Sequence, residues 1–188
     1  MKKVKLVILL TIFLSNLSFS QEMKPLYKGL LYNMPIENAK KELKKNIQDY
    51  NNISFGNGIV WEISEPYLIE SNGKLSGLGL LPKNKILGLK HENAKVYLQN
   101  SRKFFESKGY IVLKEPDNWD IPVLFSQNNL FGLLLHNPDK SIMIDLRSIK
   151  SVDSNYIVIL TIMNYDIYIK GLDAMKNQVK KEQDNTGF

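Results

Sequence analysis

The sequence predicts an α+β protein in which two amphipathic helices pack on antiparallel sheet and a third helix ends the chain. Apolar residues recur at helical spacing in two separate stretches, 36–50 and 90–108. Short runs rich in β-branched and aromatic residues, separated by turn-forming residues, fill most of the remainder. Successive strands joined by short connections pair antiparallel, and a helix with one apolar face must cover something. We therefore expect the first two helices to cover one side of the sheet.

The first 20 residues have the three-part pattern of a secretory signal peptide. Lysines at the start are followed by an apolar run, residues 4–14, and by small residues up to Ser20. The run is shorter than the roughly 20 apolar residues that a membrane-spanning helix needs. We predict cleavage between Ser20 and Gln21, which leaves a single mature domain, 21–188, in the periplasm or outside the cell. An uncleaved N-terminal anchor is the alternative. No other stretch predicts membrane insertion.

Charge and cysteine content narrow the classes of function. The whole chain carries a formal charge of +6, but the leader contributes three lysines and no acid, so the mature part has 22 basic and 19 acidic residues. This small excess does not predict a nucleic-acid partner, which needs a clustered basic face. The chain has no cysteine, which excludes thiol catalysis, cysteine-type zinc sites and a lipid-bearing cysteine.

The first half begins with an irregular lead-in and a short strand near 26–31. A four-turn helix is expected to start at Pro35, with Glu37 in its first turn. Its apolar face consists of Ile36, Ala39, Leu43, Ile47 and Tyr50, and its solvent face of Lys40, Lys41, Lys44 and Lys45. Strands are expected at 59–63 and 67–70. Asn72-Gly73 favours a tight hairpin turn, so residues 75–81 should pair back on the second of these strands.

The central unit, residues 90–113, is a helix that leads directly into a strand. Its apolar face consists of Ala94, Tyr97, Leu98, Phe104 and Phe105. Gly109 stands where the helix should stop, and residues 110–113 form a β-rich run.

An internal repeat relates the two helices. Glu-Asn-Ala-Lys at 37–40 recurs at 92–95, and the same 55-residue offset aligns Leu43 with Leu98 and Tyr50 with Phe105. Tandem sub-repeats at 33–88 and 89–170 are one interpretation. Two unrelated amphipathic helices with similar first turns are the other.

The second half is expected to be almost entirely β-structure before the last helix. Five strands are predicted, at 121–126, 130–136, 141–149, 156–163 and 166–170. The last helix is predicted from Gly171 to about Lys181, with Leu172, Met175 and Val179 on one side.

This order of elements, with its two Glu-Asn-Ala-Lys helix starts, resembles the tandem helix-plus-antiparallel-sheet architecture of secreted β-lactamase-inhibitor-like proteins. The resemblance concerns architecture, without a diagnostic motif, and transfers no functional residue. It implies a binding module rather than an enzyme.

The sequence contains no motif that predicts a catalytic centre, a cofactor or a metal site. The two histidines, His91 and His136, do not have metal-ligand spacing. His136, Asp139 and Ser141 lie too close together in one turn to be expected to form a catalytic triad. The carboxylates around Trp119, including Glu115, leave open a small cell-wall or carbohydrate-active hydrolase, which needs only two such groups.

The candidate binding residues lie in one polar loop: Asp117, Asn118, Trp119 and Asp120. An aromatic side chain in a polar loop is typical of a partner anchor, whereas Trp61 alternates with Ile59 and Ile63 and should be core. Packing of Trp119 back on the core is the alternative. The leading hypothesis is an exported, non-catalytic inhibitor or immunity protein whose partner is an enzyme or toxin. A hydrolase and an envelope-assembly or structural factor are the other hypotheses.

Overall fold

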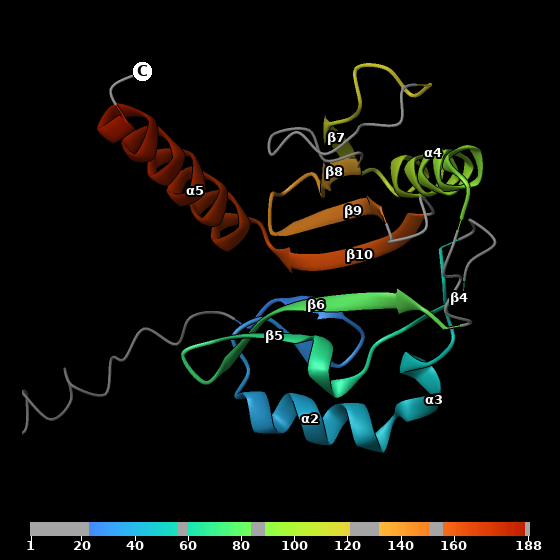
Figure 1. Cartoon of the computed structure of the whole chain (residues 1–188). Coiled ribbons are helices and arrows are strands. Elements are labelled where there is room, and N and C mark those ends of the chain that lie inside the picture. Colours follow the sequence, from blue (N-terminus) through green and yellow to red (C-terminus); the bar gives the residue numbers. More distant parts are fainter. Residues whose placement is uncertain (1–22, 56–59, 84–88, 121–131, 151–155, 187–188) are drawn as a thin grey trace, which may run out of the picture.

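The structure is a computed structural model that describes residues 23–55, 60–83, 89–120, 132–150 and 156–186. The first half contains β1 (Pro25–Tyr27), β2 (Leu30–Leu31), α2 (Ile36–Lys45), α3 (Ile47–Tyr50), β3 (Ile53–Ser54), β4 (Val60–Glu62), a 3-10 turn (Glu65–Tyr67), β5 (Leu68–Ser71) and β6 (Lys74–Pro82). The second half contains α4 (His91–Ser107), β7 (Ile111–Lys114), β8 (Gly132–His136), β9 (Ile142–Lys150), β10 (Tyr156–Asn164) and α5 (Tyr165–Thr186). These elements confirm the α+β class (Figure 1).

The main sheet joins the two halves through their last strands. Its order is β3-β4-β6-β10-β9-β8-β7, β5 also pairs with β6, and every pairing is antiparallel. The seam between the halves is the β6–β10 pair, where Leu80 lies opposite Leu160. Each half thus runs from a helix through several strands to the seam, which is the order that the sequence predicts; the duplication itself stays a prediction.

Alternate strand residues form one core that runs across the sheet. Leu80, Leu160, Leu146 and Leu133 lie in one cross-strand row, and each is 0 % exposed. Ala39 and Leu43 of α2 and Ala94, Leu98 and Phe105 of α4 belong to the same buried cluster, and Trp61 is fully buried within it. The predicted apolar face of α4, the core position of Trp61 and most of the predicted face of the first helix are therefore confirmed. The exception is Ile47, which belongs to the separate helix α3 and is 40 % exposed.

Two glycine-containing turns have the predicted geometry. Asn72 and Gly73 adopt φ values of 52° and 73° in the hairpin that joins β5 to β6. Gly109, with φ of 83°, follows the end of α4 and turns the chain into β7. Both turns need the left-handed backbone that glycine adopts without strain.

The prediction of a strand at 166–170 is wrong, because α5 already begins at Tyr165. The Asn164 side chain accepts a hydrogen bond from the Ile167 main-chain N–H at 3.2 Å and so caps the new helix directly after β10. The alternation of polar and apolar residues at 166–170 favours a strand, but the helix that this cap starts is the structure that forms. Strand 121–126 and the start of strand 130–136 lie outside the described residues.

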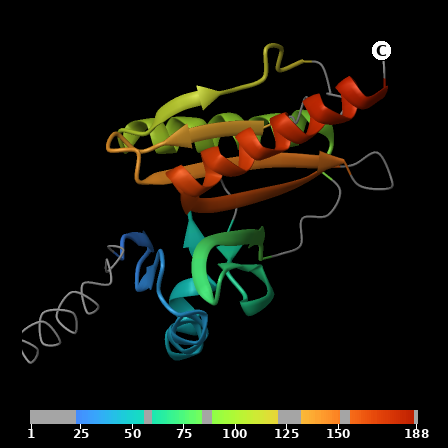
Figure 2. The same cartoon turned by 90° about the vertical axis from the view of Figure 1, so that its left-hand side faces the viewer.

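Helix α5 covers the opposite face of the sheet from α4. Tyr168 of α5 contacts Asp145 of β9, whose side chain alternates with the core residues Ile144 and Leu146. Figure 2 accordingly shows α5 in front of β9 and β10 and α4 behind them. Residues from Asp173 onward are exposed wherever their burial is described, so among the described side chains of α5 those that pack on the sheet lie in its first two turns.

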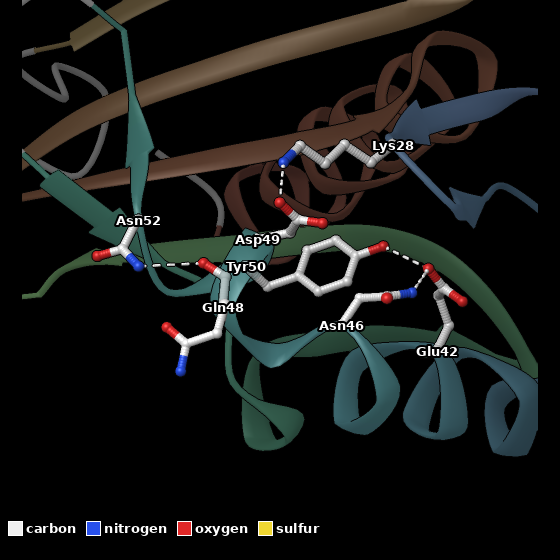
Figure 3. Close-up of polar contacts among 7 residues, drawn as sticks. All are labelled: Lys28, Glu42, Asn46, Gln48, Asp49, Tyr50 and Asn52. Atoms are coloured by element: carbon white, nitrogen blue, oxygen red, sulfur yellow. Dashed lines mark hydrogen bonds and ion pairs between the residues drawn. The ribbon is translucent and has the colours of Figure 1, made fainter.

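The helix predicted at 35–50 is broken at Asn46 into α2 and α3. A polar cluster holds this junction (Figure 3), in which Tyr50 and Asn46 donate hydrogen bonds of 2.9 and 2.8 Å to Oε1 of Glu42. Tyr50 as a whole is 1 % exposed. A Cβ atom on Gly29 would overlap the same Glu42 oxygen, so the β1–β2 turn approaches this carboxylate closely.

We expect Tyr50→Phe to lower the free energy of unfolding by about 1–3 kcal/mol, because the Glu42 carboxylate loses a charge-assisted hydrogen bond. Two causes raise the pKa of Tyr50: burial of the side chain, which is the larger, and the hydrogen bond to Glu42. The folded state therefore keeps a proton that the unfolded state loses above about pH 10. The stability that the raised pKa of Tyr50 contributes to the folded state is therefore fully present below about pH 10 and decreases above it.

Urea denaturation between pH 7 and 11 measures both effects. The loss of stability at alkaline pH should be less steep in Tyr50→Phe than in the wild type. Tyr67→Phe, at a side chain that is 43 % exposed, is the control and should change stability by less than about 0.5 kcal/mol. If the free energy of unfolding falls equally steeply with alkaline pH in Tyr50→Phe and in the wild type, ionisation of Tyr50 is not the cause of that fall.

Candidate functional site: the loop after β7

The loop at 115–120 leaves β7 and runs back along α4. Arg102 forms an ion pair with Glu115, and Lys95 forms one with Asp120. The ring Nε2–H of His91 donates to the Trp119 main-chain oxygen at 3.2 Å. The three helix residues are separated by four and seven positions, so they form one stripe on α4. This stripe holds the loop at its two ends.

The structure places the predicted site residues together but in different environments. Asp117 and Asn118 are exposed, and Asp120 is exposed although it is bound by Lys95. Asn118 Oδ1 accepts a 2.8 Å hydrogen bond from the Asp120 main-chain N–H, which closes an Asx turn. Trp119 is half-buried and packs against the core cluster. The loop thus exposes an acid and an amide beside a partly accessible indole.

Electrostatics at this loop favour the ionised form of Asp120. The hydrogen bond and positive charge of Lys95 lower the pKa of Asp120. Glu115 is bound by Arg102, which also pairs with Glu106. A glycosidase requires one carboxyl group that stays protonated near neutral pH, which needs a raised pKa. Asp120 has the opposite shift, so it is not suited to the role of this protonated acid.

The turn between β8 and β9 is closed by its own hydrogen bonds. Ser141 Oγ donates to Asp139 Oδ1 and accepts from Asn137 Nδ2, both at 2.8 Å. His136 Nδ1 donates to the Asn137 carbonyl at 2.8 Å, and its ring lies against Tyr165. His136 and Ser141 thus bind different atoms of Asn137, and no hydrogen bond joins the two side chains to each other as it would in a triad.

A buried polar cluster beneath α5 was not predicted. Arg147 Nε lies 2.8 and 2.7 Å from the two carboxylate oxygens of Asp145, and Tyr168 donates a 2.6 Å hydrogen bond to the same carboxylate. Burial of Tyr168 is the larger cause of its raised pKa, and the negative charge of Asp145 is the next. The sequence did contain one indication of this cluster: Asp145 and Arg147 are charged residues at alternate positions of an otherwise apolar strand, so their side chains lie on the same face. The cluster fastens α5 to the sheet.

Within the described ranges, no group of three or more His, Asp or Glu side chains is arranged to hold a metal ion. None of the helices described combines the length and apolar character needed to cross a membrane. Comparisons of the chain with protein-family models, with curated proteins and with solved structures found no match.

Proposed function

We propose that this chain is an exported, non-catalytic binding protein that neutralises an enzyme or toxin by protein–protein contact, as an inhibitor or immunity protein does. The observation that carries the proposal is the loop at 115–120, whose ends are fastened to α4 while Asp117 and Asn118 remain exposed. A loop held in one conformation loses little conformational entropy on binding. Pre-organisation of this kind supports a recognition role.

The chemistry of the loop indicates the kind of surface that it fits. Tryptophan is enriched among residues that dominate binding energy, and half-buried Trp119 offers an apolar edge. Asp117 is exposed beside it and suits a basic patch or the entrance to an active site. We therefore expect a protein partner, no nucleic acid and no cofactor. Export with cleavage between Ser20 and Gln21 is part of the proposal.

Reversal of one loop charge tests the proposal. A tagged chain expressed in its own host should recover a partner from the cell envelope, and Asp117→Lys should weaken this complex at least tenfold with an unchanged melting temperature. Glu70→Lys makes the same charge change at an exposed position of β5 and should retain the partner. Trp119→Ala should also lose it.

Addition of the purified chain to the recovered partner should inhibit the partner's activity. If Asp117→Lys and Trp119→Ala bind the partner as well as the wild type does, the loop at 115–120 is not the binding surface. Turnover of peptidoglycan or glycan fragments by the chain alone, lost in Asp117→Asn, would replace the binding function with the hydrolase hypothesis.

A further inference from the structure

We draw no further inference here: the strongest candidate, the cavity of about 250 Å³ between the Tyr32–Asn33 segment, the β5–β6 hairpin and the first turn of α5, is a depression bordered by the exposed polar residues Ser71, Asn72 and Lys74, and nothing in the described part of the chain shows which ligand would occupy it.

Discussion

Replacement of Leu98 by alanine is expected to lower the free energy of unfolding by about 2–5 kcal/mol, through lost burial and the cavity left behind. Leu98 is 0 % exposed and lies on the face of α4 that packs against the sheet. Two residues earlier, Val96 is 50 % exposed, so Val96→Ala is the matched control and should cost less than about 0.5 kcal/mol. Chemical denaturation of both variants measures the difference. Similar losses at the two positions would contradict this orientation of the helix.

Asp145→Ala is expected to cost about 3–5 kcal/mol, because it leaves a partly buried guanidinium without its carboxylate. Asp145 is 5 % exposed, and its carboxylate accepts hydrogen bonds from both Arg147 and Tyr168. The same change should loosen α5, so limited proteolysis should cut that helix faster than in the wild type.

A double variant with apolar residues at 145 and 147 separates the cost of an unpaired buried charge from the cost of lost side-chain packing. Asp145→Leu with Arg147→Met removes both charges and should recover part of the stability lost in Asp145→Ala. Recovery should be incomplete, because the buried Tyr168 hydroxyl loses both of its partners. Asp117→Ala, at an exposed acid, is the control and should be nearly neutral. A cost below about 1 kcal/mol for Asp145→Ala would show that the cluster does not hold α5.

The features predicted well from the sequence are those with a strong local cause. Leu98 and Phe105 recur at the period of a helix, and Asn72-Gly73 supplies the backbone geometry of a tight hairpin. The start of α5 was missed because a short alternating run also fits a helix, and the deciding hydrogen bond comes from the side chain of Asn164. A local pattern is reliable when no neighbouring cap competes with it.

The contacts of the site depend on long-range packing, which local patterns do not contain. Asp120 was selected as a candidate, but its partner Lys95 lies 25 residues away and becomes visible only when the loop folds back on α4. Asp145 and Arg147 stood two positions apart in the sequence, yet Tyr168 joins them only because α5 crosses the outer face of the sheet.

The seam between β6 and β10 also governs the order in which the fold can form. Leu80 and Leu160 meet across it although most of the second half of the chain separates them, whereas β5–β6 and β9–β10 are local pairs. Pairings of high sequence separation must overcome a larger loop-closure entropy and slow folding. The local hairpins should therefore form first and the seam last. Neither half can complete its sheet until the chain has been synthesised through β10.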